Sequence, residues 1–360
     1  MMNNFIELLA PARRYLKKIK DKKLKQLFVD NIEKVREDPT IGQMKTGDLN
    51  GVYVHGFHYN KTEYRIAYLI KVNDDGSLTT VILIGEHENF YDELKNYVKK
   101  HLGGKKMFDF KDQVVIVTGS GSKRGIGRGI ANMFAEAGAQ VIIADMNEQG
   151  CKDTVDEIKA AGYKADGFVL NIADEDSVNA FVKNVKDKYG KIDVLVNNAG
   201  ITQRVTVHDM TLADMKRVFN VNMFGTFLIT KAVVEVMKEK KYGRIVSLSS
   251  VSAKRGGGVF GGAHYSASKA ALLGFSKNLA REVAEYGITV NCVCPGAINT
   301  DIRKNMNGTE EDDIKLAKEI PMKRIGEVFE VAGPIVFLAS KEAGYITGED
   351  IDINGGSHMD

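Results

Sequence analysis

The chain has 360 residues, of which 44% are hydrophobic and 27% are charged, and its formal net charge is +3. These values are typical of a globular protein of two or three domains and exclude a disordered or fibrous chain. No apolar run reaches the roughly 18 residues that cross a bilayer, and the N-terminus lacks the apolar segment of a secretory signal, so we expect a cytoplasmic protein without a membrane partner.

The three cysteines, Cys151, Cys292 and Cys294, are too few for a disulfide framework and lack the spacing of a metal site. Cys292 and Cys294 lie in a strand-like run, which favours small buried side chains. We therefore expect a reducing environment and no bound metal.

Charge divides the chain into two unlike parts. Residues 1–106 contain 19 Lys and Arg against 14 Asp and Glu, so the rest contains 31 against 33, because the whole chain has 50 and 47. Gly103 and Gly104 with two lysines are expected to form a short flexible joint. We predict a first domain at 1–102, a linker at 103–106 and a second domain at 107–360.

The first domain is predicted to be a small α+β module. Basic amphipathic helices are expected over 11–19 and 22–36, strands over 52–58, 64–72 and 79–85 with a hairpin turn at 73–76, and a last helix over 91–100. We expect the three strands to form a small antiparallel sheet.

This order of elements resembles the RelE/ParE toxins of bacterial toxin–antitoxin pairs, and the stretches 47–51, 64–68 and 84–91 carry the resemblance. RelE-type members cut messenger RNA on the ribosome, so the resemblance implies that Arg65, His87 and Tyr91 act on RNA. Its partners would be an antitoxin, or the ribosome and mRNA. Two alternatives stay open: lysine runs usually form solvated helix faces, and the module could be an inert part of a natural or engineered fusion.

The second domain begins with a strand, a glycine-rich turn and a helix. Residues 114–118 form a β-branched run, and the turn leads to Gly125 and Gly127 at the start of an amphipathic pattern. Glycines at a helix start let a pyrophosphate approach the backbone N–H groups. Asp145 ends the next strand, 18 positions after Gly127, close to the ~20 expected for the acid that binds an adenosine ribose.

Strands and helices then alternate to the end of the chain. Helices are predicted over 126–137, up to 161, 175–189, from Thr211 with Asp214 in a capping box, 265–285, 310–319 and 327–339. Strands are predicted over 140–145, 167–170, 192–196, 245–248, 289–293 and 350–353. The fold class is therefore α/β, a Rossmann-type doubly wound parallel sheet, with ligands at the carboxyl ends of its strands. The charged segment 299–324 is expected to cover the substrate as a lid.

Tyr265 and Lys269 stand four positions apart and so share one face of a predicted helix. We expect the ammonium of Lys269 to lower the pKa of Tyr265 from its usual ~10, which would make it a proton donor or acceptor. Ser250 closes the preceding strand, where its hydroxyl can hold a substrate carbonyl. Each feature alone is common in helices and turns.

Residues 108–358 resemble the short-chain dehydrogenase/reductases. The matching signatures are Thr118-Gly119 with Gly125-Ile-Gly127, Asn197-Asn-Ala-Gly200, Asn222, Ser250, Tyr265 with Lys269, and Pro295-Gly296 followed by Ile298 and Thr300. The resemblance implies hydride transfer between a nicotinamide and a carbinol carbon, with Tyr265 as general acid/base. It also implies that Lys269 binds the nicotinamide ribose, Ser250 orients the carbonyl, Asn222 supports a proton relay, and the protein is a homo-oligomer, usually a tetramer.

The same resemblance implies a set of cofactor contacts at the strand ends. They are Gly119, Ser122, Arg124, Gly125, Ile126, Gly127, Asp145, Asn171, Ile172, Asn198, Ala199, Gly200, Tyr265, Lys269, Pro295, Gly296, Ile298 and Thr300. Asn198 and Gly200 are expected to act as scaffold.

The cofactor is expected to be NAD, with NADP possible. Asp145 would repel a 2′-phosphate and bind a free ribose diol, whereas Lys123 and Arg124 could attract that phosphate. The carboxylate stands at the strand end where the ribose must lie, so we favour NAD(H).

Three departures from the family pattern bear on the function. Five residues, 120–124, separate Gly119 from Gly125 where three are common, so the phosphate turn should bulge, and Asn171 replaces an aspartate that often contacts adenine. The glycine-rich loop between Ser250 and Tyr265 is longer than in typical acyl-carrier-protein reductases, which counts against that substrate class.

The leading hypothesis is therefore an oxidoreductase that interconverts a secondary alcohol, such as a polyol, sugar derivative or hydroxy compound, and its ketone. The first alternative is reduction of a 3-oxoacyl thioester on acyl carrier protein, for which Lys238, Lys240 and Lys241 could form a landing surface. The alternative from another class is that the N-terminal module acts as an mRNA-cleaving toxin or an antitoxin-binding protein.

Overall fold

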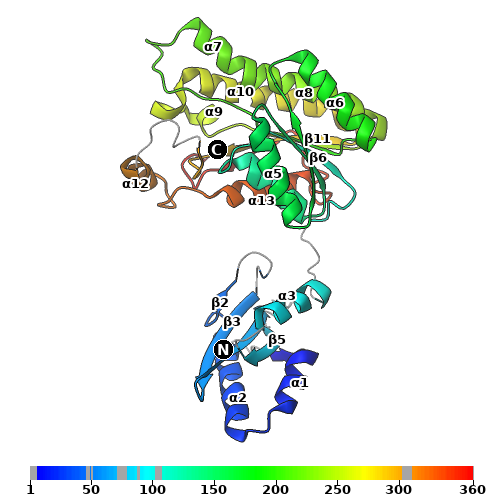
Figure 1. Cartoon of the computed structure of the whole chain (residues 1–360). Helices are drawn as coiled ribbons and strands as arrows, with labels where there is room; N and C mark the ends of the chain where they lie inside the picture. Colours follow the sequence, from blue (N-terminus) through cyan, green and yellow to red (C-terminus); the bar gives the residue numbers. More distant parts are fainter. Residues whose placement is uncertain are drawn as a thin grey trace. The chain divides into compact units, whose positions relative to one another are not determined.

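The chain forms two compact units, Met1–Met107 and Phe108–Asp360 (Figure 1). The computed structural model describes residues 6–45, 49, 52–70, 79–86, 90–101, 108–301 and 310–359. His87, the predicted hairpin turn at 73–76, the predicted linker at 103–106 and residues 302–309 of the predicted lid lie outside these residues. Among the described helices, none is both long and apolar enough to cross a bilayer.

The first unit contains a five-stranded sheet of order β1-β5-β4-β3-β2. Its strands are β1 Ile6–Leu8, β2 Gln43–Met44, β3 Val52–Tyr59, β4 Thr62–Ile70 and β5 Thr79–Glu86. The three predicted strands, β3, β4 and β5, pair antiparallel as expected, and β1 adds an edge strand that runs parallel to β5. Strands of three and two residues are too short to show a sequence period, so β1 and β2 escaped prediction.

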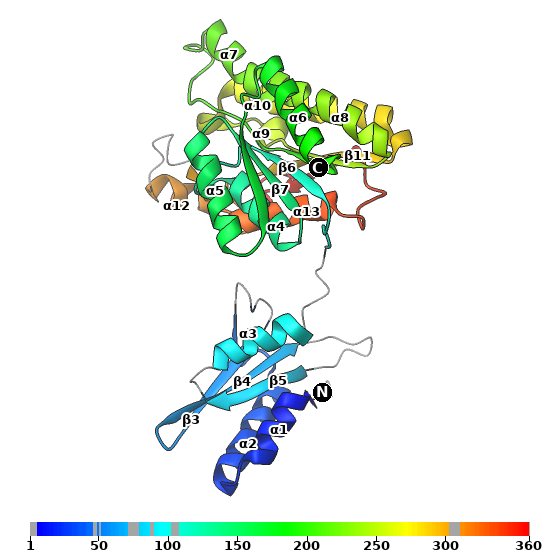
Figure 2. The same ribbon diagram turned by 45° about the vertical axis from the view of Figure 1, so that its right-hand side comes forward.

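Helices cover both faces of this sheet (Figure 2). They are α1 Ala10–Lys18, α2 Lys22–Glu37 and α3 Phe90–His101. Alternation along β3 explains the two faces: Val52 and Val54 pack in the core beneath α3, while Tyr53 and Phe57 pack with α1 and α2 around Phe28. The side chain of Asp21 caps α2 by accepting the N–H of Lys23 at 2.8 Å.

The second unit is built on a seven-stranded parallel sheet of order β12-β11-β10-β9-β6-β7-β8. Its strands are β6 Val114–Thr118, β7 Gln140–Asp145, β8 Lys164–Val169, β9 Val194–Asn197, β10 Gly243–Leu248, β11 Ile288–Pro295 and β12 Asp350–Ile353. Every residue of β6, β9 and β10 is buried, as expected for strands covered on both faces.

Helices lie on both faces of that sheet (Figures 1 and 2). They are α4 Ile126–Glu136, α5 Glu148–Ala160, α6 Glu175–Tyr189, α7 Leu212–Phe219, η2 Asn220–Gly225, α8 Thr226–Lys240, α9 Ser252–Arg255, α10 Gly258–Val283, η3 Ala284–Tyr286, α12 Glu310–Glu319 and α13 Val328–Ala339. One core joins α4, α5 and α13 to the sheet, and the other joins α6, α8 and α10. This arrangement confirms the predicted Rossmann-type α/β fold.

The loop predicted between Ser250 and Tyr265 is largely helical. It contains α9, and α10 begins at Gly258 rather than at Tyr265. Gly262 interrupts α10 with a φ of 64° and a ψ of 163°, a conformation that glycine adopts readily. The glycines that favoured a loop thus introduce a break inside a helix.

Strand β6 lies between β7 and β9, and the strands that follow it in the chain are added first on its β7 side and then on its β9 side. The chain moves from β6 outward to β7 and β8, then returns to β9 on the other side of β6. Such a reversal separates the loops at the carboxyl ends of the strands and leaves a crevice for a ligand. The predicted site residues follow these strand ends.

Candidate active site

Two glycines of the turn after β6 are required by close packing. Gly119 has a φ of +65°, and a Cβ there would lie 2.7 Å from the Cα of Ala199. A Cβ on Gly127 would lie 2.4 Å from Nδ2 of Asn198 and 2.5 Å from the carbonyl oxygen of Gly119. These glycines allow the start of α4 to sit against the ends of β6 and β9.

The five-residue turn is held against the neighbouring elements. The hydroxyl of Ser120 donates to the carbonyl of Val117 at 2.7 Å, and the hydroxyl of Thr154 on α5 donates to the carbonyl of Ser120 at 3.0 Å. The N–H of Gly121 donates to the carboxylate of Asp145 at 2.9 Å. Asp145 therefore lies beside the turn at the end of β7.

The far side of the turn contacts a carboxylate from the segment after β11. The N–H of Arg124 donates to Oδ2 of Asp301 at 2.9 Å, and the hydroxyl of Ser122 donates to the same oxygen at 3.4 Å. The guanidinium of Arg124 donates to Oδ1 of Asn299 at 2.9 Å. Asp301 and Asn299 were not predicted as site residues.

Asn198 connects β9 to the glycine turn. Its Nδ2 donates to the carbonyls of Thr118 and Gly119, both at 2.8 Å, and its backbone N–H donates to the hydroxyl of Thr118 at 3.1 Å. With these donors satisfied inside the chain, the side chain of Asn198 positions the turn.

Asn222 lies in the π-helical segment η2 and is fully buried. Its Oδ1 accepts the N–H of Ile201 at 2.8 Å, and its Nδ2 donates to the carbonyl of Ile201 at 2.9 Å and to the hydroxyl of Ser268 at 3.0 Å. Ser268 in turn donates to the carbonyl of Tyr265 at 2.8 Å. Asn222 thus links the segment after β9 to the helix that carries Tyr265.

Ser250, Tyr265 and Lys269 come together at the end of β10. The hydroxyl of Ser250 is hydrogen-bonded to the phenol of Tyr265, and the Nζ atom of Lys269 lies 5.8 Å from the centre of the Tyr265 ring. The ammonium of Lys269 donates to the carbonyl of Leu248 at 2.6 Å. This group can exchange a proton with a carbonyl or alcohol held at Ser250.

The predicted effect of Lys269 on Tyr265 was wrong for this arrangement. Burial raises the pKa of Tyr265 above its usual value, and the hydrogen bond from Ser250 only partly opposes this. Burial also lowers the pKa of Lys269 to about 8. Because Lys269 is directed to the carbonyl of Leu248, its charge does not offset the loss of solvent around the phenol.

His264, which precedes Tyr265, is buried next to the break in α10. Its Nδ1 accepts the backbone N–H of Tyr265 at 2.9 Å. A Cβ on Gly262 would lie 2.8 Å from Cε1 of the ring and 3.2 Å from the carbonyl oxygen of Gln203. The absence of a Cβ at Gly262 therefore leaves space for the imidazole of His264.

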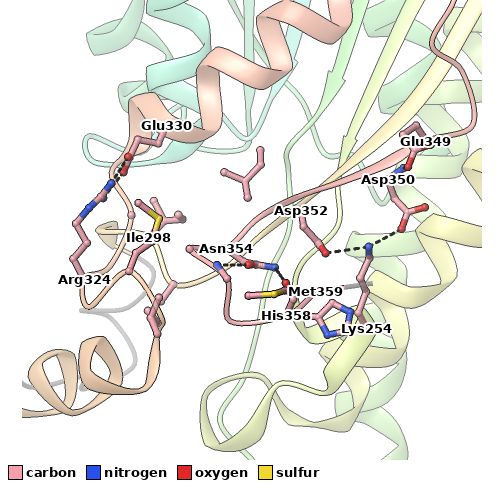
Figure 3. A pocket seen from close by; sticks show the side chains of 17 residues that line it. Lys254, Ile298, Arg324, Glu330, Glu349, Asp350, Asp352, Asn354, His358 and Met359 are labelled. Carbon is pink, nitrogen blue, oxygen red and sulfur yellow. Dashed lines mark hydrogen bonds and ion pairs between the residues drawn. The ribbon is translucent and has the colours of Figure 1, made fainter.

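A buried ion cluster anchors α9, the helix directly after Ser250. Nζ of Lys254 lies 3.0 Å from a carboxylate oxygen of Asp350 and 3.3 Å from one of Asp352 (Figure 3). These side chains line a cavity of about 620 Å³ along β12 and the segments that flank it. Its lining includes Ile298 but none of Ser250, Tyr265 and Lys269, so the catalytic candidates lie outside this cavity.

The structure brings the remaining predicted cofactor residues to the same edge of the sheet. Asn171 and Ile172 follow β8, Ala199 and Gly200 follow β9, Pro295 ends β11, and Gly296, Ile298 and Thr300 come after it. Gly125 is the N-cap of α4 and has no side-chain cap, so Ile126 begins a helix whose first N–H groups can face an anion. This helix start, with Asp145 nearby, fits a dinucleotide.

Two of the three predicted residues of the first unit, Arg65 and Tyr91, lie in contact, whereas His87 is outside the described residues. The guanidinium of Arg65 lies 4.8 Å from the centre of the Tyr91 ring and pairs with Glu63 at 3.0 Å. Lys45 lies over the same ring at 5.5 Å. The structure therefore brings Arg65 and Tyr91 together.

Sequence reasoning missed Ser268, His264, Asn299 and Asp301. Ser268 lies three positions after Tyr265, so helical spacing could have indicated it. Asp301 follows Thr300, but its contact with a turn 177 positions earlier has no local signal.

Comparison with known proteins gives a separate match for each unit. Residues 119–358 match the family described as Enoyl-(Acyl carrier protein) reductase, and residues 7–95 match the one described as ParE-like toxin of type II bacterial toxin-antitoxin system.

Curated relatives cover most of the second unit. An uncharacterized short-chain type dehydrogenase/reductase from Sinorhizobium fredii is 41% identical over 247 residues, which are 68% of this chain and 97% of that protein. The 3-oxoacyl-acyl-carrier-protein reductase from Escherichia coli is 40% identical over 251 residues, 70% of this chain and 99% of that protein. The enzyme of the same name from Salmonella typhimurium is 40% identical over 250 residues, 69% of this chain and 99% of that protein.

Proposed function

The chain belongs to the short-chain dehydrogenase/reductase family, and from that membership we propose that its second unit reduces 3-oxoacyl thioesters to 3-hydroxyacyl thioesters. The observation that carries the proposal is the identity of about 40% with 3-oxoacyl-acyl-carrier-protein reductases over nearly their whole length. These relatives favour the thioester alternative over the polyol or sugar substrate expected first. Both hypotheses share the same reaction class, the interconversion of a secondary alcohol and its ketone.

The chain's own residues supply the proton chemistry of this reaction. The hydroxyl of Ser250 holds the 3-oxo oxygen, and the phenol of Tyr265, hydrogen-bonded to Ser250, gives its proton to that oxygen. The raised pKa of Tyr265 suits this direction, because it keeps the phenol protonated until the oxygen becomes basic. Bound NAD(P)H supplies the hydride to the carbonyl carbon. Asn222 and Ser268 hold the helix turn that presents Tyr265.

We propose NAD(H) as the preferred cofactor. Asp145 lies at the end of β7, where the adenosine ribose binds in this type of fold, and its charge opposes a 2′-phosphate. Lys123 and Arg124 are the cations that could attract such a phosphate, and of these Arg124 donates to Asn299 and lies 4.0 Å from Asp301. The negative charge of Asp301 offsets the positive charge of Arg124, which binding of the 2′-phosphate of NADP(H) would require.

The test is to measure NADH and NADPH oxidation by the full chain with acetoacetyl thioesters of coenzyme A and of acyl carrier protein, and NAD+ and NADP+ reduction by the full chain with a panel of polyols and sugars. We expect turnover of the thioesters, and the Tyr265→Phe variant should lose roughly 10²-fold or more. Oxidation of a polyol without thioester reduction would refute the substrate class. Equal turnover by Tyr265→Phe would refute the proton chemistry.

The lysines suggested as a docking surface for a carrier protein lie at the opposite end of β10 from Ser250. Lys238 and Lys240 are in the last turn of α8, before β10 begins, whereas Ser250 follows the end of β10. Six residues of strand span roughly 20 Å. A carrier protein bound at these lysines would need its prosthetic arm to reach around the sheet, so the proposal does not depend on them.

We also propose that the protein is a homo-oligomer, as expected from the family. Phe224 in η2 and Phe227 in α8 are 52% and 40% exposed, and both lie close to Asn222 along the chain. Exposed aromatic side chains this close together along the chain favour association. Light scattering of the full chain tests this, with Phe224→Ser expected to shift the distribution toward smaller species.

A second candidate function belongs to the first unit. We propose that it binds an antitoxin protein, because residues 7–95 match a toxin family of type II toxin–antitoxin systems. Cleavage of mRNA is less supported, since the charge of Arg65 is already paired with Glu63. Co-purification of the full chain with a co-expressed antitoxin would support the proposal, whereas failure of the two proteins to co-purify would count against it.

A further inference from the structure

Asp301 occupies the part of the glycine-rich turn that is expected to bind phosphate. Its Oδ2 accepts hydrogen bonds from the N–H of Arg124 at 2.9 Å and from the hydroxyl of Ser122 at 3.4 Å. Its backbone N–H donates to the carbonyl of Arg124 at 3.4 Å, which fixes the segment on the turn. Ser122 and Arg124 are both among the residues predicted to contact the cofactor.

A carboxylate and a pyrophosphate compete for the same donors. A backbone N–H carries one hydrogen, and so does a hydroxyl, so each can be fully donated to one anion at a time. Both anions also favour the positive end of α4, which begins just after Arg124 and has no side-chain cap at Gly125. The contact made by Asp301 is therefore of the kind that a phosphate oxygen would make.

We propose that Asp301 is an intrachain competitor for the pyrophosphate of the dinucleotide and so sets the affinity of the second unit for its cofactor. This inference rests on the proposed function, since it requires a dinucleotide at the turn. Binding of the pyrophosphate displaces the carboxylate from Arg124 and Ser122 and costs the energy of those contacts. The length of the turn fits this role, because its five residues carry Ser122 and Arg124 out to reach Asp301.

The experiment measures binding without turnover. Dissociation constants of NADH, ADP-ribose and adenosine are determined by calorimetry or by NADH fluorescence for the parent chain and for Asp301→Asn. The asparagine retains the shape of the side chain but is a weaker competitor because it has no charge. The matched control is Asp187→Asn, which changes net charge equally at an exposed residue of α6 that pairs with Lys183.

In Asp301→Asn we expect NADH and ADP-ribose to bind roughly two- to fivefold more tightly at low ionic strength, the range for one anion at a helix start. The gain should shrink in high salt. Adenosine lacks the pyrophosphate, and its affinity should not change; Asp187→Asn should bind all three ligands as the parent does.

Unchanged or weaker NADH binding by Asp301→Asn would overturn the inference, and weaker binding would show that Asp301 supports the turn instead. An equal gain for adenosine would also overturn it, because the effect would not involve the phosphates. If neither the parent nor the variants bind any dinucleotide, the proposed function itself fails.

Discussion

The buried charge of Lys269 should make the second unit less stable than a neutral side chain would. Lys269 is only 4% exposed, and burial lowers its pKa from 10.5 to about 8. That difference corresponds to about 3 kcal/mol, since one pKa unit corresponds to about 1.4 kcal/mol. We therefore expect Lys269→Met to stabilise the second unit at pH 7 by about 3 kcal/mol.

The pH dependence of this gain has a definite sign. Below the folded-state pKa of about 8, the lysine is protonated in both states and the full cost of burying the charge is present. As pH rises toward the unfolded-state value of 10.5, the folded state releases its proton first and the cost falls. Linkage predicts that the advantage of Lys269→Met shrinks by roughly 2 kcal/mol between about pH 7 and about pH 9.5.

The assay is urea denaturation of the full chain at both pH values, with unfolding followed by pulse proteolysis and detection of peptides from 108–359. This detection separates the second unit from the first. Lys277→Met is the matched control on the same helix, because Lys277 is 56% exposed and pairs with Asp350 at 2.7 Å. It should give no gain in stability. The reasoning is refuted if Lys269→Met is no more stable than the parent at pH 7, or if its gain is the same at both pH values.

Three further substitutions test the site. Asp145→Ala should raise the ratio of kcat/KM for NADPH over NADH about tenfold, or about 1.4 kcal/mol, and an unchanged ratio in steady-state kinetics would refute the assignment. Gly127→Ala should lower the free energy of unfolding by about 1–3 kcal/mol, because its Cβ would lie 2.4 Å from Asn198, and urea denaturation measures this. His264 accepts the N–H of Tyr265 only when neutral, and burial lowers its pKa below 6.5, so stability should fall as pH drops below that value. His264→Asn, with a non-titrating acceptor, should reduce the loss of melting temperature between about pH 7.5 and about pH 5.5; an equal loss would contradict this role.

Regular elements were predicted well where local pattern and tertiary packing favour the same structure. Helix α6 and strand β12 occupy the predicted residues, and Thr211 and Asp214 form the predicted capping box. A helix of several turns repeats its apolar period often enough to be recognised, and a cap is a local interaction. Short or irregular elements were missed, because β1, β2 and α9 contain four residues or fewer.

Contacts between distant segments were not predicted, because they depend on tertiary packing. The pKa of Tyr265 depends on burial, and the direction of the Lys269 ammonium depends on the carbonyl of Leu248, 21 positions earlier. Spacing on a helix showed that Tyr265 and Lys269 share a face, but not how much water reaches them. The expected lowering of the tyrosine pKa failed for that reason.

The sequence by itself determined the alternation of strands and helices, the family signatures and the residue types of the site. These are encoded in short stretches, because side-chain period, turn glycines and helix spacing act over a few residues. Only the tertiary structure decided that Asp301 rests on the turn at Arg124, that Ser268 links Asn222 to Tyr265, and that Lys269 is directed toward Leu248. Such contacts depend on how the sheet orders its strands, which no single stretch specifies.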